Sequence, residues 1–297
     1  MLLGVVVVIV ALPVIWFLSR PAPRPAGPAT FQGDLAYEYV VAQMEFGPRI
    51  TGSAEHAAAG DYIVGEVRAL GWVVEIQPFV YQDTPARNFI AKANVGRGPV
   101  LILGAHYDTR RRADQDAQNP TAPVPGANDG ASGVAVLLEL ARSLDLESVP
   151  YEVWLAFFDA EDNGNLDGWD WIAGSSFMAA NLTVTPTAMI LVDMIGDVDQ
   201  QIYFDQNSDS ELSARVWRTA ADLGYDEYFL PLARYAMIDD HTPFARRGIP
   251  SIDIIDFDYP YWHTTADTAD KVSAASLERV GRTLETFVEE SLTTPLP

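Results

Sequence analysis

The sequence YEVWLAFFDAED at residues 151–162 decides the fold of this chain. Its first part is apolar and aromatic, as in a buried strand of an α/β sheet, and its end carries Asp159, Glu161 and Asp162. Ligands of open α/β sheets bind at the carboxyl ends of the strands. Crowded carboxylates are costly to desolvate unless a cation or hydrogen-bond donors compensate them, and no basic residue follows until Arg215. The stretch therefore suggests a metal ion, with an ordinary solvated acidic loop as the alternative.

The sequence on both sides of this strand alternates between predicted strands and helices. The alternation predicts a single α/β domain with a central, mixed but mostly parallel twisted sheet and helices on both faces. Besides the strand at 152–158, we expect strands at about 72–81, 88–93, 99–105, 188–193 and 251–255. We expect helices at about 34–45, 53–70, 131–144, 171–181, 212–223 and 274–292.

The first 18 residues carry no charge. A stretch of this length is just long enough to cross a bilayer as a helix, and it is longer than the ~7–15 apolar residues of a typical signal peptide. We expect a membrane anchor or uncleaved signal at 1–18, a Pro-rich linker at 19–33 and the catalytic domain at 34–297. The catalytic domain should lie outside the cytoplasm, membrane-anchored, or secreted if the segment is cleaved. Arg20 and Arg24 by themselves favour the opposite orientation.

The composition excludes several kinds of site. The chain has 41 acidic and 19 basic residues, a net charge of -22 that repels phosphate backbones, so we expect no nucleic-acid partner. It has no cysteine, which excludes disulfides and thiolate metal sites. A transition metal must therefore be held by carboxylates and by the four histidines.

Residues that could bind a metal follow predicted strands at several places. Each taken alone has an ordinary interpretation, such as a core histidine or a turn aspartate, but their joint occurrence favours a metal site. Histidine and carboxylate ligands without sulfur suit a catalytic Zn²⁺. The candidates are His106 with Asp108, Asp129, Glu161 with Asp162, Asp193 and His263.

Six motifs resemble, in order and approximate spacing, a zinc exopeptidase family that includes secreted aminopeptidases and animal-type glutaminyl-peptide cyclotransferases. The resemblance covers about residues 35–293 and implies the fold of these enzymes. The motifs are GAHYDT (104–109), GANDGASGV (126–134), FFDAED (157–162), VDMIG (192–196), DDHTPF (239–244) and WHTTADT (262–268).

The resemblance implies roles for residues at the motif positions. Asp129, Asp162 and His263 would bind zinc, and Glu161 would be the general acid/base. In addition, His241 of the DDHTPF motif would be structural.

The two branches of the family differ in the use of the remaining residues. In the aminopeptidases, His106 and Asp193 would complete a second zinc site, with Asp129 bridging and Asp108 orienting His106. In the cyclotransferases one zinc is used, and acids such as Asp193 and Asp239 would form a hydrogen-bond network around the base.

Tryptophans favour the cyclotransferase branch. An insertion, NGNLDGWDWIAGS at residues 163–175, carries Trp169 and Trp171, and Trp262 directly precedes His263. Trp262 with either Trp169 or Trp171 would make a small pocket for a flat, neutral glutaminyl side chain, although packing alone is the alternative role. The glycine-rich ANDGASG at residues 127–133 and the retention of both residues of the second zinc site are compatible with hydrolysis. Asp162 stands in place of the commoner glutamate, which shortens that ligand arm and alters the position of the zinc.

We therefore expect a zinc-dependent cyclotransferase that converts an N-terminal glutamine to pyroglutamate and releases ammonia. Its partners would be the N-termini of peptides or proteins, and the membrane through the N-terminal segment. The first alternative is a two-zinc aminopeptidase. The second is an inactive ectodomain that uses the fold for binding, because fold alone does not fix function.

Overall fold

The computed structural model describes residues 30–290. The predicted membrane segment, residues 1–18, lies outside this range, as does most of the predicted linker. Within residues 30–290, no helix has the length and apolar character needed to cross a bilayer. The membrane anchor and the location of the catalytic domain therefore stay predictions.

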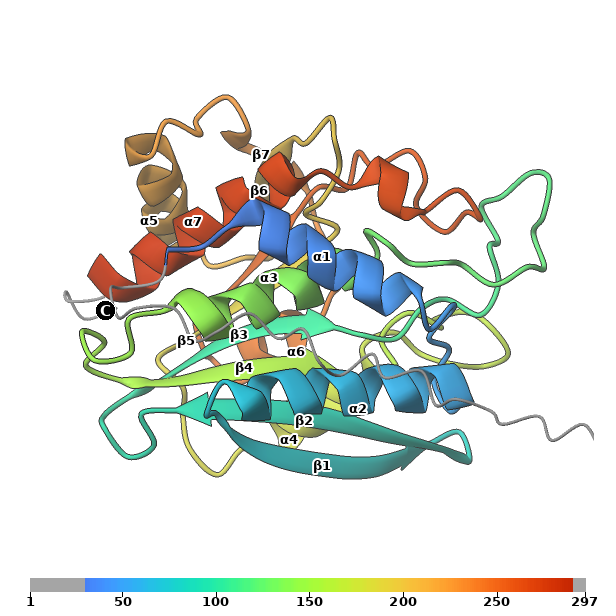
Figure 1. Ribbon diagram of the computed structural model, residues 1–297, viewed down its shortest axis with the longest axis horizontal. Helices are drawn as coiled ribbons and strands as arrows, with labels where there is room; N and C mark the ends of the chain where they lie inside the picture. Colours follow the sequence, from blue (N-terminus) through green and yellow to red (C-terminus); the bar gives the residue numbers. More distant parts are fainter. Residues whose placement is uncertain (1–29, 291–297) are drawn as a thin grey trace, which may run out of the picture.

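The centre of the fold is a six-stranded sheet in the order β1-β2-β4-β3-β5-β8 (Figure 1). The pairs β1/β2 and β2/β4 are antiparallel, and β4/β3, β3/β5 and β5/β8 are parallel, which confirms the predicted mixed, mostly parallel sheet. The strands are β1 (Val73–Tyr81), β2 (Thr84–Ala93), β3 (Val100–His106), β4 (Glu152–Phe158), β5 (Ala188–Asp193) and β8 (Ser251–Ile255).

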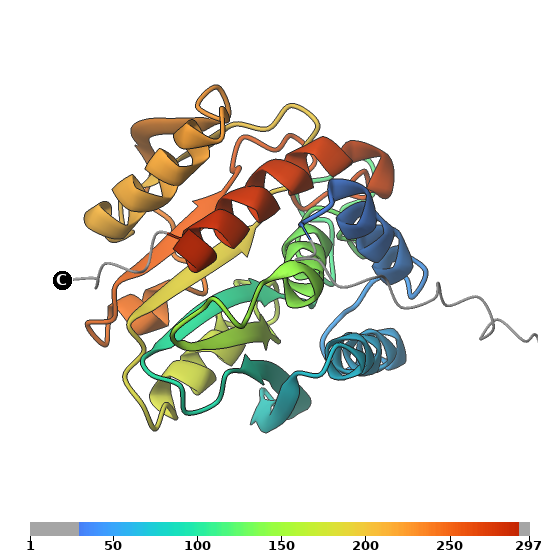
Figure 2. The same cartoon turned by 60° about the vertical axis from the view of Figure 1, so that its left-hand side comes forward.

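Helices cover both faces of this sheet. Figures 1 and 2 show α1, α2, α3 and α7 on one face, and α4 and α6 on the other. Side chains alternate accordingly: Leu155 of β4 belongs to the larger core cluster, whereas Trp154 packs with Met178 of α4 and Phe244 of α6. The helices are α1 (Gly33–Met44), α2 (Ala54–Ala69), α3 (Ala131–Ser143), α4 (Ala173–Ala180), α5 (Ser210–Asp222), α6 (Thr242–Ala245) and α7 (Ala274–Glu290).

Four short elements were not predicted, and one of them is the four-residue helix α6. β6 (Ile202–Asp205) and β7 (Phe229–Tyr235) form a separate two-stranded parallel sheet, and η1 (Ala269–Lys271) is a single 3₁₀ turn. β6 lies against β8 at the edge of the main sheet. The middle of β7 is exposed and contains Pro231, so it lacks the apolar alternation that signals a strand.

The packed region begins before residue 34. Phe31 is only 2% exposed, and its ring packs against Gly281 of α7, where a Cβ atom would lie 2.1 Å from the ring. The carbonyl of Thr30 accepts a hydrogen bond of 2.8 Å from Arg142 Nη2 at the end of α3. Residues 30–33, which the sequence analysis placed in the linker, are therefore part of the folded domain.

Candidate active site and metal centre

The candidate site lies where the parallel strands β3, β4 and β5 end. His106 ends β3 and Asp193 ends β5, and Glu161 and Asp162 lie in the turn after β4. Asp129 stands two residues before α3. The structure brings these side chains together, because the carboxyl ends of parallel strands meet at one edge of a sheet.

Asp129, Asp162 and His263 form one group that could hold a metal ion. Each offers a ligand atom, and these atoms lie within 4.8 Å of one another. His263 Nε2 is 2.9 Å from Asp162 Oδ1 and 3.6 Å from Asp129 Oδ2. All three side chains are buried. This is the ligand set that the resemblance implied for zinc.

His106, Asp129 and Asp193 form a second such group. His106 Nε2 is 3.1 Å from Asp129 Oδ1 and 3.2 Å from Asp193 Oδ1. Asp129 thus presents Oδ1 to one group and Oδ2 to the other, as a bridging carboxylate would.

Unsatisfied oxygens show that the first group fits a cation. Asp129 Oδ2 and Asp162 Oδ2 are buried and have no hydrogen-bond partner within the described part of the chain. Buried carboxylate oxygens are normally paired, because an unpaired one loses its hydration without compensation. A divalent ion between these oxygens and His263 would satisfy both.

The raised pKa values of two carboxyl groups also favour a cation at this site. Burial and the nearby charge of Asp129 raise the pKa of Asp162 to about 6. Burial, together with the charge of Asp239, raises the pKa of Asp193 to about 7 against the opposing effect of His106. Without a cation, these groups therefore take up protons at a higher pH than an ordinary carboxyl does, and a bound metal ion would keep them ionised.

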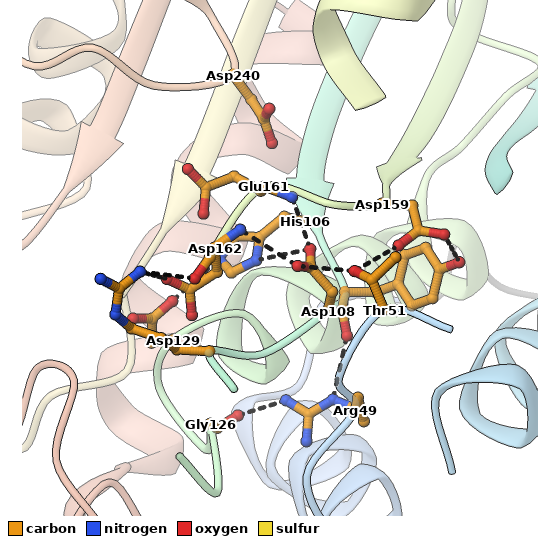
Figure 3. A network of polar contacts seen from close by, with 12 residues as sticks. Arg49, Thr51, His106, Asp108, Gly126, Asp129, Asp159, Glu161, Asp162 and Asp240 are labelled. Atoms are coloured by element: carbon orange, nitrogen blue, oxygen red, sulfur yellow. Dashed lines mark hydrogen bonds and ion pairs between the residues drawn. The ribbon is translucent and has the colours of Figure 1, made fainter. Parts of the chain in front are cut away.

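Glu161 lines the same pocket beside the metal ligands. Burial raises the pKa of Glu161 well above its ordinary value, and the charges of Asp239, Asp162 and Asp240 add to this, whereas His106 opposes it. A carboxyl with a raised pKa can accept a proton and return it, which is the property that a general acid/base needs. Figure 3 shows Asp240 across from the Glu161 side chain.

Asp108 fixes the turn that carries Glu161 and Asp162. Its carboxylate accepts hydrogen bonds from the amides of Glu161 and Asp162, at 3.0 and 3.2 Å (Figure 3). Its Oδ1 also lies 3.7 Å from His106 Nδ1, which agrees with the predicted orienting contact. The hydroxyl group of Thr51 lies within hydrogen-bond distance of two buried carboxylates, at 3.3 Å from Asp108 and 3.1 Å from Asp159.

Three residues of the site have left-handed backbone angles that non-glycine residues rarely adopt. Ala160, just before the base, has φ 57°, Met194 has φ 46°, and the ligand His263 has φ 55°. Such conformations cost roughly 1–3 kcal/mol each and persist where the surroundings impose them, as at functional sites.

The two acids that the resemblance assigned to a network around Glu161 lie in the same pocket. Asp193 and Asp239 line the pocket together with Glu161. Burial, together with the charges of Asp239 and Asp193, raises the pKa of the neighbouring Asp253 well above its ordinary value. His241 does not line the pocket. It is fully buried and lies 3.4 Å from a carboxylate oxygen of Asp205, as expected for a structural residue.

The pocket is small and has aromatic walls. Its volume is about 160 Å³. Trp262 stacks on the His263 ring at 3.7 Å between centroids, and Trp171 faces the same ring in parallel at 5.8 Å. The remaining apolar lining comes from Met194, Met237, Ile238, Ile255 and Phe257.

Trp169, one of the two alternatives for the second aromatic wall, does not line the pocket. It is 5% exposed and packs with Phe79, Ala86 and Ala173 away from the pocket. Of the two tryptophans in the insertion, only Trp171 lines the pocket.

Substitution of these two tryptophans should separate their functions. Trp169→Ala is expected to lower the free energy of unfolding by about 3–5 kcal/mol, because it removes a buried ring. Trp171→Ala should lower kcat/KM by about tenfold or more while the loss of stability is smaller, because Trp171 is half-exposed at the pocket. Denaturant unfolding and steady-state kinetics measure the two effects. Equal loss of kcat/KM in folded samples of both variants would contradict the assignment.

Several supporting residues were not found from the sequence. Asp267 accepts hydrogen bonds from the amides of Asn128 and Asp129, at 2.8 and 3.2 Å, and so fixes the shared ligand. Arg49 binds the carbonyl of Gly126 at 2.6 Å on the same loop (Figure 3). The aspartate of the WHTTADT motif was a possible signal for the first of these, but nothing local marks Arg49.

Comparisons with known proteins agree with the motifs. The sequence matches Peptidase family M28 over residues 88–288. A glutaminyl-peptide cyclotransferase of Drosophila melanogaster is 28% identical, in an alignment that covers 82% of this chain and 77% of that protein. The structure of Porphyromonas gingivalis glutaminyl cyclase is similar, with a TM-score of 0.84 and 37% identity. The alignment covers 89% of this chain and 99% of that protein. A Zn-dependent exopeptidase from Parabacteroides distasonis has a TM-score of 0.83 and 34% identity, with coverages of 89% and 100%.

Proposed function

This chain belongs to peptidase family M28, and we propose that within this family it acts as a zinc-dependent glutaminyl-peptide cyclotransferase. It would convert the N-terminal glutamine of a peptide or protein into pyroglutamate and release ammonia. The likeness to a glutaminyl cyclase of known structure supports the proposed reaction. The likeness to a Zn-dependent exopeptidase supports zinc as the metal.

The observation that carries the proposal is the shape of the pocket. Its volume of about 160 Å³ is small beside the roughly 300–1,000 Å³ of pockets for drug-sized ligands. Trp171 and Trp262 give it flat walls next to Glu161. Such a pocket suits one flat, neutral side chain whose amide reaches the base and the metal ligands.

Asp129, Asp162 and His263 would hold a single zinc ion. When bound, zinc supplies a Lewis acid that polarises the γ-carbonyl group of the glutamine. The side chains of Trp171 and Trp262 orient the glutamine and exclude water, so that its α-amine is the nucleophile.

Glu161 would move the proton. It takes a proton from the α-amine as the bond between the α-nitrogen and the γ-carbon forms, and it gives this proton to the amide nitrogen as the bond to that nitrogen breaks. The products are pyroglutamate and ammonia. Asp239 and Asp240 support this exchange by raising the pKa of Glu161, together with burial, which has the largest effect.

A second candidate function is hydrolysis of N-terminal residues by a two-zinc aminopeptidase. The observation in its favour is the second ligand group, His106, Asp129 and Asp193, with Asp129 in the bridging position. In that reaction Glu161 would take a proton from water, and water would be consumed.

A Gln-initiated and a Leu-initiated peptide, assayed side by side, distinguish the two functions. A cyclotransferase releases ammonia from the first peptide and leaves the second intact, and elemental analysis finds one zinc per chain. Cleavage of the Leu-initiated peptide with two zinc ions per chain would establish the aminopeptidase and refute the proposal.

Zinc should bind more weakly as the pH falls, because protons compete for the ligand oxygens. The pKa of Asp162 is raised to about 6 in the metal-free protein. Its protonation alone should therefore weaken zinc binding about fourfold between pH 7.5 and pH 5.5.

The metal-free fold should have the opposite pH dependence. Asp162 and Asp193 have pKa values raised to about 6 and about 7, so the folded protein binds their protons more tightly than the unfolded chain does. Their contribution to stability is complete below the ordinary carboxyl pKa of about 4 and is lost as the pH rises through 6 to 7. The rise in Tm caused by zinc should therefore be larger at pH 7.5 than at pH 5.5. Thermal unfolding with and without zinc measures it, and the reverse order would contradict the prediction.

A further inference from the structure

Arg110 is a buried arginine in the wall of the metal site. Its side chain is 2% exposed, and it pairs in two-point fashion with Asp114, with Nε to Oδ1 at 2.7 Å and Nη2 to Oδ2 at 2.9 Å. The same guanidinium donates to the carbonyl of Asp162 at 2.9 Å and to that of Gly164 at 3.3 Å. Arg110 therefore holds the backbone of a predicted metal ligand.

Asp114 connects this arginine to a second ligand, His263. Asp114 Oδ1 lies 3.6 Å from His263 Nδ1, too far for a direct hydrogen bond but close enough for a charge contact. His263 Nδ1 is buried and has no hydrogen-bond partner among residues 30–290. The amide of Gln115 donates to the carbonyl of His263 at 3.3 Å. Metal-binding histidines generally direct their second ring nitrogen to a carboxylate or carbonyl, which sets the ring orientation.

Arg110 also contacts the pocket wall. Its guanidinium lies over the Trp171 ring at 4.8 Å, and Trp171 in turn faces His263. Gly164 leaves room for this arrangement, because a Cβ atom there would lie 2.1 Å from the indole of Trp171. One side chain thus contacts the ligand turn, the carboxylate beside the ligand histidine, and the tryptophan of the pocket.

We propose that Arg110 and Asp114 are a positioning pair, which fixes Asp162 and His263 in the geometry that binds the metal and holds Trp171 against the pocket. This inference rests on the proposed zinc site. It assigns a function to the long segment between β3 and α3, which carries Arg110 and Asp114.

A purely structural role, in which the pair only fastens the loop, predicts a different result. The loop has other attachments that do not involve Arg110: Asp116 accepts a hydrogen bond of 3.0 Å from the amide of Thr265, and Arg49 binds Gly126. If the pair only fastened the loop, weakening it would lower stability and leave zinc affinity in the folded protein unchanged.

The experiment compares zinc affinity in Asp114→Asn and Arg110→Lys with wild type. Asn keeps the shape of Asp114 without its charge, and Lys keeps the charge of Arg110 without its planar two-point geometry. We expect each to weaken zinc binding about 10- to 100-fold, the usual effect of losing an outer-shell partner of a metal ligand. Competition with a chromophoric chelator, without substrate, measures the dissociation constant. The visible absorption spectrum of the cobalt(II)-loaded protein should also change, because it reports ligand geometry.

The neighbouring pair Arg112 and Asp167 supplies matched controls. Arg112 Nη2 binds Asp167 Oδ1 at 2.7 Å, and both side chains are largely exposed, at 38% and 54%. Within residues 30–290, neither side chain pairs with a candidate metal ligand. Arg112→Lys and Asp167→Asn make the same chemical changes and should leave the zinc dissociation constant within twofold of wild type.

Wild-type zinc affinity and an unchanged cobalt spectrum in both Asp114→Asn and Arg110→Lys would overturn the proposal. Circular dichroism and thermal unfolding of the metal-free proteins check folding. Asp114 is about a third exposed, so Asp114→Asn decides the outcome if Arg110→Lys does not fold. A wild-type chain that binds no zinc would refute the metal site itself. Because no substrate is used, failure of the ammonia assay would refute only the cyclotransferase function and would leave this result standing.

Discussion

Glu161→Gln is expected to lower kcat for a Gln-initiated peptide by about 10³-fold. Glutamine has the size of glutamate but cannot take up and return a proton, and general acid–base catalysis contributes roughly 10²- to 10⁴-fold. Zinc should remain bound, because Glu161 belongs to neither ligand group. Ammonia release gives kcat, and elemental analysis of the same sample gives the zinc content.

Glu75→Gln is the matched control for this variant. Glu75 lies on β1, half-exposed and paired with Lys92 at 2.7 Å, and does not line the pocket. It should keep the wild-type kcat. If Glu161→Gln retained more than a tenth of wild-type kcat with zinc bound, Glu161 would not be the group that transfers the proton.

Asp129→Asn should nearly abolish metal binding. Asp129 is the shared residue of both ligand groups, and asparagine removes its charge and replaces one of its two oxygens by an amide nitrogen. We expect zinc affinity to fall by more than about 100-fold, beyond the 10- to 100-fold effect of losing an outer-shell partner. Chelator competition measures the affinity. At a zinc concentration below the new dissociation constant, ammonia release should fall to background.

Asp226→Asn, an exposed substitution of the same kind after α5, should leave zinc affinity unchanged. Zinc binding by Asp129→Asn within threefold of wild type would show that the metal is held elsewhere. If Asp129→Asn lost both its zinc and its folded structure, His263→Ala would test the ligand assignment instead. This variant should also lose zinc, because it removes the imidazole of a proposed ligand.

Much of the fold could be predicted because the apolar periodicity is strong. β4 and β8 have the predicted bounds, and both are buried along their whole length. Ser53 caps α2 at the start of the predicted range, with its side chain accepting a hydrogen bond from the amide of His56 at 3.1 Å. β6 and β7 escaped prediction because short or exposed strands have no repeating apolar pattern.

The position of the site could be predicted, but not all its contacts. Strand ends meet in any parallel sheet, so His106, Asp193 and the acids after β4 were expected to lie together. Their separate roles came from the resemblance to the zinc exopeptidase family. The choice between Trp169 and Trp171 depends on the path of the insertion, where Asp167 and Ile172 have left-handed backbone angles that no sequence pattern specified.

Sequence reasoning mainly missed the residues that support the site from distant parts of the chain. No basic residue follows Asp159, Glu161 and Asp162 in the sequence until Arg215. A metal ion was therefore the first explanation for these clustered acids. In the structure Arg110, 52 residues before Asp162, binds the carbonyl of that ligand. The arginine supports the backbone of the ligand and does not replace the cation, since its nearest nitrogen is 3.8 Å from the Asp162 carboxylate.

The place where the chain enters the folded domain determines how the enzyme can be attached to a support. Thr30 is bound by Arg142 near the end of α3, whereas the metal ligands surround the start of that helix, about 18 Å away along its axis. A resin, a surface or a fused protein attached directly at Thr30 would therefore meet the domain at the end of α3 that lies away from the candidate metal ligands. Immobilisation at Thr30 should leave the pocket open.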